Sequence, residues 1–171
     1  ELDTVPAGKA AIGYNCSSLI NPGSNYRVFD DILKYVYDAG EGTGEKEEVG
    51  HQQNYKMGVL MGIMTVESIS KATEKYGNKP MSGEQVRWGI ENLDLNEARL
   101  KEMGIDGFIP AFKVSCSDHE GSAPVKFQKW NGKEFEPASD WIATDQSIVR
   151  PMIEASASGY AKEKGITPGC N

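Results

Sequence analysis

The stretch Tyr55–Gly77, YKMGVLMGIMTVESISKATEKYG, carries the longest regular pattern in this chain of 171 residues. On a helix its apolar side chains fall on two faces, with Met57, Met61 and Met64 on one and Val59, Ile63 and Val66 on the other. A helix that is apolar on most sides is typical of a buried position. The later part turns polar, and Gly77 predicts the C-terminal end. We therefore expect a buried core helix over 55–76.

Two shorter helices are predicted downstream by their capping residues. Ser82 followed by Gln85 matches a capping box, which predicts a helix continuing to about Leu93. Asn96 is a favourable N-cap for a second helix, and Gly104 is a natural end for it. These helices read as scaffold rather than as a catalytic centre.

Upstream, the run Lys9–Tyr14, KAAIGY, could form a strand. The breaker NPGSN at 21–25 follows, and a helix is then predicted over 28–36 by the spacing of its apolar residues, with Gly40 as its cap. The segment Gly40–Gly50, GEGTGEKEEVG, is glycine-rich like a phosphate-binding loop. Because it follows a helix and its glutamates would repel phosphate, we expect a solvated loop.

The last third of the chain has the alternation typical of strands. Phe112, Val114 and Cys116 alternate with polar residues, as do Val125 and Phe127. Asn131-Gly132 within WNGKEF is a strong hairpin signal. A final helix is predicted from about Pro151 to Lys164, with Gly165 ending it.

Composition argues against some classes of partner, but it does not decide how the three cysteines are paired. The net charge of −7 and the pI near 4.9 argue against nucleic acid and against an anionic membrane surface. Cys16, Cys116 and Cys170 form no CxxC pair, so a structural zinc site is not expected. One disulfide is possible, and spacing does not choose among its three pairings.

The segment Lys113–Gly121, KVSCSDHEG, gathers residue types that occur in catalytic and metal sites. Ser117, Asp118 and His119 are consecutive, so they cannot converge as a catalytic triad by themselves. Asp118, His119 and Glu120 could ligate a metal in a metal-assisted hydrolase, but consecutive residues make a poor cage and no HExxH motif accompanies them. We favour a strand that ends in a polar turn, with Cys116 packed rather than reactive.

Taken in order, several segments make the chain resemble the C-terminal half of the type I periplasmic solute-binding proteins of the branched-chain amino acid ABC transporter family. They are AGKAAIGYN, VFDDILKYVYDAG, YKMGVLMGIMTVESISKA, GEQVRWGIENLD, SCSDHEG, VKFQKWNGKEFEPASDWI and PMIEASASGYAKEKGI. The resemblance implies an α/β fold with Rossmann-like lobes, of which this chain would be only the C-terminal portion of a two-lobed whole. It also implies that Asp118, His119 and Gly121 form a structural turn.

The resemblance implies a division of the chain into three parts. Residues 1–50 would be the end of lobe 2, with a strand, a helix and the acidic Gly-rich loop. Residues 51–112 would hold the crossover and the helices that return to lobe 1, and residues 113–171 the late strands, the Asn-Gly hairpin and the C-terminal helix. The chain begins ELDTVPAGK, with no initiator Met and no signal-peptide pattern. We therefore expect a fragment whose N-terminal half lies elsewhere.

The function that the resemblance implies is binding without catalysis. The chain would belong to the substrate-binding component of an ABC importer, which captures an amino acid, amide or aromatic acid between two lobes in the periplasm, after removal of a signal peptide that this chain does not contain. The expected partners are the small-molecule ligand, the permease membrane subunits and the missing N-terminal half, with no nucleic acid, cofactor or metal. Candidate ligand-binding residues are Tyr14, Asn15, Gln53 and Tyr55. A ligand-sensing regulator or receptor domain of the same fold is the alternative.

Overall fold

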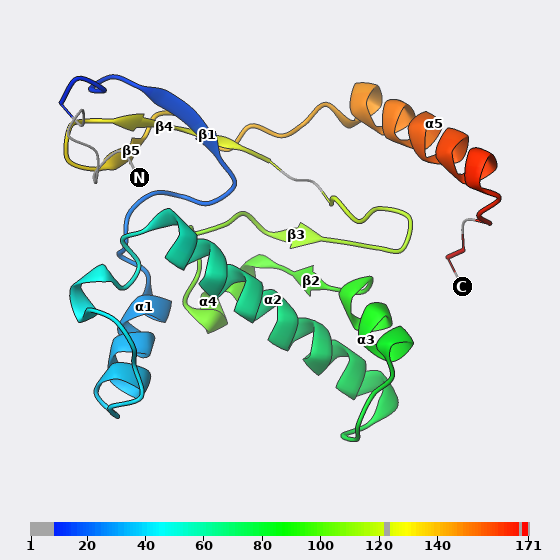
Figure 1. The fold of residues 1–171 in the computed structure, drawn as a ribbon, viewed down its shortest axis with the longest axis horizontal. Coiled ribbons are helices and arrows are strands. Elements are labelled where there is room, and N and C mark those ends of the chain that lie inside the picture. The colour runs from blue at the N-terminus through cyan, green and yellow to red at the C-terminus, as the bar shows by residue number, and fades with distance from the viewer. Residues whose placement is uncertain (1–8, 122–123, 168, 171) are drawn as a thin grey trace.

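The computed structural model describes residues 9–121, 124–167, 169 and 170. Its longest helix, α2 (Gln53–Tyr76), ends at Gly77 as the sequence predicts and runs through the lower part of Figure 1. Lys56, Leu60, Ser68 and Ala72 are its buried residues, whereas Met61 and Val66 are 58% and 63% exposed. The predicted helix is confirmed. Its burial on most sides is wrong, because α2 packs against the core with one face only.

Five further helical segments lie between residues 27 and 103. They are α1 (Arg27–Ile32), which continues into the π-helical turn η1 (Leu33–Tyr37), then the short 3-10 turn η2 (Lys46–Glu48), α3 (Gly83–Ile90) and α4 (Glu97–Met103). The caps are those expected from sequence. Gln85 N donates to Ser82 Oγ at 3.4 Å and Ser82 N donates to Gln85 Oε1 at 3.0 Å. Asn96 Oδ1 accepts from Arg99 N at 3.0 Å. Each such cap is worth about 1 kcal/mol.

The buried core lies among these helices and the connections between them. Its members are Ile20, Phe29, Val49, Leu60, Leu93, Leu95, Leu100, Ile105, Phe108, Ile109 and Val114. Tyr26, Phe29 and Phe108 form a ring cluster at its centre, with centroids 5.0–6.1 Å apart. Each fully buried side chain of this size contributes about 1.5–3 kcal/mol, so the cluster fixes how the 19–29 segment meets the helices.

Two small antiparallel sheets complete the fold. The larger has the order β1-β4-β5, formed by β1 (Asn15–Ser18), β4 (Lys126–Trp130) and β5 (Phe135–Pro137), and lies above the helices in Figure 1. The smaller pairs β2 (Asp94–Leu95) with β3 (Phe112–Lys113). The strand expected at Lys9–Tyr14 is wrong: residues 9–13 form turns and the strand begins at Asn15. The pairing partner, β4, decides this position, and it is more than a hundred residues away.

The hairpin predicted at Asn131-Gly132 is confirmed, whereas the two-residue connection that this dipeptide favours is wrong. Trp130 pairs with Phe135, so the connection has four residues, and Asn131 Oδ1 accepts from the backbone N–H groups of Lys133 and Glu134, each at 2.8 Å. The buried face of β4 carries Gln128 and Trp130, whereas Phe127 is exposed.

Helix α5 (Gln146–Lys164) begins earlier than predicted. Asp145 caps it, accepting from Ser147 N at 3.0 Å, and Pro151 lies inside the helix rather than at its first turn. The end at Gly165 is confirmed. Figure 1 shows α5 standing away from the other helices, and Ala161 is its only buried residue.

Candidate ligand-binding site

Two of the four candidate residues lie at one end of the larger sheet. Tyr14 immediately precedes β1, with its side chain 53% exposed, and its carbonyl accepts from Trp130 N at 2.9 Å. Asn15 begins β1 and donates from Nδ2 to the Gly13 carbonyl at 3.0 Å. Both side chains therefore reach solvent beside the start of β1.

The other two candidates lie in the first turn of α2. Gln53 Nε2 donates to Ser18 Oγ at 3.4 Å, which connects α2 to the last residue of β1. The Tyr55 ring lies 6.4 Å from that of Phe29, and partial burial raises the pKa of the Tyr55 hydroxyl. Among the described residues, no hydrogen bond or ring contact joins Tyr14 or Asn15 with Gln53 or Tyr55. The structure thus places the candidates as two pairs rather than one cluster.

A polar cluster that the sequence reasoning missed lies between β1 and the start of α2. Ser18 is 7% exposed, and its Oγ accepts from Ile20 N at 3.2 Å as well as from Gln53. Lys56 is 5% exposed, and its Nζ donates to the Gly23 carbonyl at 3.3 Å. Burial lowers the pKa of the Lys56 ammonium. A lysine within the apolar run at the start of the predicted helix was the signal available in the sequence.

The segment that covers this cluster is itself polar. Asn21 follows the core residue Ile20, and its Oδ1 is buried without a hydrogen-bond partner. The Tyr26 hydroxyl donates to the Pro22 carbonyl at 3.2 Å, and burial raises its pKa. Hydroxyl, amide and ammonium groups gathered at the junction of a strand and two helices can hold a polar solute.

A hollow of about 400 Å³ lies between α2 and the start of α4. Its charged side chains neutralise one another. Arg99 donates to both carboxylate oxygens of Glu67, at 2.6 and 2.7 Å, and Lys71 pairs with Glu74 at 3.1 Å. Because these charges are already paired, the junction around Lys56 is the stronger candidate for binding.

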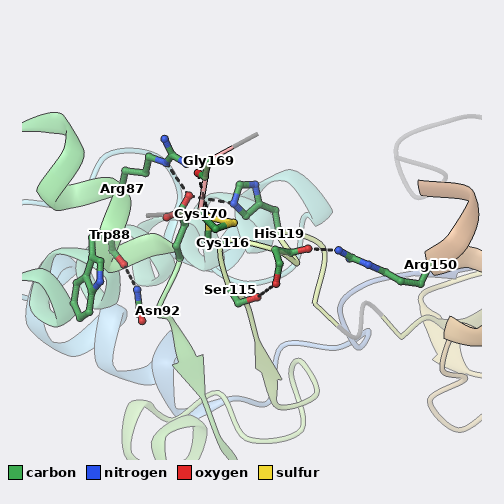
Figure 2. Close-up of a disulfide and its surroundings, with 11 residues drawn as sticks. Arg87, Trp88, Asn92, Ser115, Cys116, His119, Arg150, Gly169 and Cys170 are labelled. Atoms are coloured by element: carbon green, nitrogen blue, oxygen red, sulfur yellow. Dashed lines mark hydrogen bonds and ion pairs between the residues drawn. A yellow bond between two sulfur atoms is a disulfide. The ribbon is translucent and has the colours of Figure 1, made fainter. Parts of the chain in front are cut away.

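The segment 115–121 forms the turn shown in Figure 2. Ser115 and Asp118 exchange backbone hydrogen bonds at 2.9 and 3.1 Å, and Asp118 Oδ1 accepts from Gly121 N at 3.0 Å. Gly121 has a φ of 61°, a left-handed conformation that glycine adopts without strain.

Of the three consecutive residues considered as metal ligands, His119 contacts Glu91, whereas Asp118 and Glu120 share Arg150 as their partner. His119 Nε2 lies 3.3 Å from Glu91 Oε1, which also accepts from Arg87 Nε at 2.7 Å. The Arg87 guanidinium, with a smaller effect of His119, lowers the pKa of Glu91. From the opposite side of Figure 2, Arg150 reaches Asp118 at 3.1 Å and Glu120 at 3.3 Å. Within the described residues, no three His, Cys, Asp or Glu side chains are arranged to hold a metal ion.

The cysteines resolve the pairing that the sequence left open. Cys116 is bonded to Cys170, with Cα atoms 5.4 Å apart, and Cys16 is free. Cys116 is therefore held by a covalent bond beside the turn, rather than simply packed as predicted.

Within the described ranges, no helix combines the length and the apolar character needed to cross a membrane.

Comparisons with known proteins place this geometry in a known fold. No protein-family model and no curated protein matches the chain. A crystal structure described as an ABC transporter permease from the Pseudomonas fluorescens group matches 97% of this chain and 40% of its own, with a TM-score of 0.89 and 37% identity. A branched-chain amino acid ABC transporter from Thermus thermophilus with bound valine matches 81% of this chain and 35% of its own, with a TM-score of 0.60 and 22% identity.

The chain thus spans less than half the length of either similar protein. Both of these proteins are described as parts of ABC transporters. The chain has a mixed α/β fold that corresponds to part of the type I periplasmic-binding-protein fold, which confirms the predicted fold class.

Proposed function

We propose that this chain is the C-terminal portion of the substrate-binding component of an ABC importer, which captures an amino acid, amide or aromatic acid between two lobes. The match to 97% of the chain at a TM-score of 0.89 supports a component of an ABC transporter, although that protein is described as a permease, and the structural likeness to the valine-bound protein carries the substrate-binding role. The bound valine of the Thermus thermophilus structure supports a small solute as ligand. In this proposal the chain performs no catalysis, and its partners are the solute, the permease subunits and an N-terminal half of the same protein.

The division of the chain belongs to the same proposal. Residues 1–50 end lobe 2, residues 51–112 return to lobe 1, and residues 113–171 supply the late strands, the hairpin and the C-terminal helix. Gln53 and Tyr55 line the cleft from α2, and Tyr14 and Asn15 line it from the start of β1. The link from Gln53 to Ser18 supports this arrangement, because it joins the α2 pair to the strand that carries the other pair.

A periplasmic location is part of the proposal. The Cys116–Cys170 disulfide supports it, since disulfides persist in oxidising compartments. A ligand-sensing regulator or receptor domain of the same fold is the alternative. The complete reading frame separates them, because an importer component carries a signal peptide and a cytoplasmic regulator does not.

The test is a thermal-shift screen of the product of the complete reading frame against amino acids, amides and aromatic acids. A ligand that binds only the folded state stabilises it by about 2.7 kcal/mol at a concentration one hundred times its dissociation constant. We expect stabilisation by members of one chemical class, without turnover. A folded protein that none of these compounds stabilises would remove the proposal.

A further inference from the structure

Lys56 is a buried cation, and no carboxylate of residues 9–121 or 124–167 lies beside it. Its side chain is 5% exposed, and the Gly23 carbonyl, at 3.3 Å, is the one hydrogen-bond partner of its Nζ among the described residues. Burial alone accounts for its lowered pKa, with no contribution from a neighbouring acid. A buried ammonium is ordinarily paired with an anion, because removing the charge from water costs several kcal/mol. Two of the three N–H donors of this group are therefore available to a further acceptor.

The helix that carries Lys56 adds to the positive potential at this point. α2 has 24 residues, and no side chain caps its N-terminus at Gln52. Its first backbone N–H groups therefore have no partner within the helix. Lys56 is the fourth residue of α2, so it belongs to the same first turn as these N–H groups. A free helix N-terminus with a buried ammonium beside it favours a bound anion.

The buried ammonium of Lys56 is hydrogen-bonded to a residue that is itself exposed. Gly23, whose carbonyl accepts its hydrogen bond, is exposed, and nothing lies within 4 Å of the position that a Cβ would occupy there. Gln53, one turn before Lys56 on the same face of α2, also contacts the β1–α1 connection, through Ser18. A solute held by Gln53 needs to replace only one long hydrogen bond, that from Nζ to Gly23, to reach the ammonium.

We propose that Lys56 binds a carboxylate of the captured solute, so that the ligand is a carboxylic acid rather than a neutral amide. This inference rests on the proposed function and narrows its ligand class. The Lys56 ammonium supplies the ion pair, the first N–H groups of α2 supply hydrogen bonds, and Gln53 contacts a neighbouring polar group of the solute. Binding of the acid also offsets the cost of keeping the ammonium buried.

The experiment compares acids with the amides that match them in shape. The product of the complete reading frame is titrated with benzoate and benzamide, and with phenylacetate and phenylacetamide, by calorimetry and thermal shift. Three proteins are compared: the wild type, Lys56→Met, and the control Lys71→Met, which removes an exposed lysine of the same helix. Circular dichroism establishes that each variant is folded.

We expect the wild type and Lys71→Met to bind one of the acids more tightly than its amide by about tenfold or more. Lys56→Met should lose this preference and keep its affinity for the amide. A folded Lys56→Met that binds the acid as the wild type does, or a wild type that prefers the amide, would overturn the inference while leaving the proposed function in place. A wild type that none of the four probes stabilises would overturn the inference, and the wider screen would then decide the proposed function separately.

Discussion

Cys170 is bonded to Cys116, which precedes it by 54 positions, so the chain returns after α5 to the 115–121 turn (Figure 2). A cross-link over a loop of this length stabilises a fold by up to about 4 kcal/mol, through lost entropy of the unfolded chain. We predict that the double variant Cys116→Ala/Cys170→Ala unfolds at a lower urea concentration than the wild type. The wild type under a reducing agent should unfold at the same lower concentration.

Thiol titration supplies the control for this prediction. The denatured, unreduced protein should show one reactive thiol, that of Cys16, and three after reduction. Cys16→Ser should leave the urea midpoint close to that of the wild type. Three thiols without reduction, or equal stability with and without the disulfide, would contradict the prediction.

Gly89 is the point of closest approach between α3 and α2. A Cβ at this position would lie 2.1 Å from the backbone oxygen of Ser68, which cannot move without displacing α2. We predict that Gly89→Ala destabilises the protein by about 1–3 kcal/mol, because the helices must separate to admit the methyl group. Chemical denaturation measures the change.

Gly62 provides the matched control, since it lies in α2 with nothing within 4 Å of its would-be Cβ. Gly62→Ala should stabilise the protein by about 0.5–1 kcal/mol, because alanine restricts the unfolded chain and favours the helix. Equal effects of the two substitutions would show that the α2–α3 contact is not as close as described.

The position of an element could be predicted from the sequence where residues close in the chain determine it. It could not be predicted where a pairing partner far along the chain determines it. The caps at Ser82 and Asn96 depend on hydrogen bonds to residues three positions away, so their signals are local and correct. The start of β1 depends on pairing with β4, and no local pattern around Lys9–Tyr14 reports it. Pro151 drew the predicted start of α5 away from Asp145, because proline favours the first turn of a helix and lacks the N–H that an interior position donates.

The residues of the candidate site also differ in whether local sequence could identify them. Gln53 and Tyr55 could be selected because a family resemblance pointed to the start of α2. Ser18 gave no such signal and Lys56 only its place in an apolar run, because the burial of both arises only when the 19–25 segment folds over them. The pairing of Cys116 with Cys170 likewise required the path of α5, which spacing along the chain does not contain.

The ion pair between Arg99 and Glu67 joins α4 to α2 through two hydrogen bonds, at 2.6 and 2.7 Å. Most of the Glu67 side chain is buried. The hydrogen bonds from Arg99 to Glu67 and to Glu102 together raise the pKa of the Arg99 guanidinium. We predict that Glu67→Gln lowers the free energy of unfolding by about 1–3 kcal/mol, the range for hydrogen bonds to charged groups.

Glu74→Gln is the comparison for this pair, since Glu74 pairs with Lys71 in an exposed position on the same helix. Its effect should be about 0.5 kcal/mol or less. A double-mutant cycle with Arg99→Gln isolates the coupling. A Glu67–Arg99 coupling no larger than that of the exposed pair would refute the assigned role.

Lys56 predicts a dependence of stability on pH. Its folded-state pKa lies below the ordinary value of 10.5 because of burial. Between the two values the unfolded chain binds more protons than the folded protein, so the free energy of unfolding rises with pH. Below the folded-state pKa the full cost of the buried charge is present. Lys56→Met should therefore be more stable than the wild type at neutral pH, and the difference should shrink as the pH approaches 10.5.

Urea denaturation of both proteins from neutral pH to about 10.5 measures this difference. Lys71→Met serves as the control, because its ammonium is exposed and should contribute no comparable rise. Parallel curves for the wild type and Lys56→Met would mean that the ammonium is solvated in the folded protein, which would also weaken the case for a bound carboxylate.

Helix α5 presents an apolar face that the described residues do not cover. Ile148, Met152 and Tyr160 are 59–67% exposed, and a hollow beside them is lined by Val149, Met152, Ile153, Ser156, Ala157 and Tyr160. Exposed apolar patches of this kind promote association. We predict that the 171-residue chain produced by itself self-associates, so that its mass by light scattering rises with concentration.

A charge on this face should oppose association, and the same charge elsewhere on α5 should not. Met152→Glu places a carboxylate within the apolar face, whereas Ser158→Glu places it on the opposite side of the helix. The first variant should remain monomeric at concentrations where the wild type and the second associate. In a longer protein whose additional segments cover α5, the wild type should be monomeric and Met152→Glu should be destabilised instead. A 171-residue wild type that stays monomeric at the highest attainable concentration would show that α5 folds back to cover this face in solution.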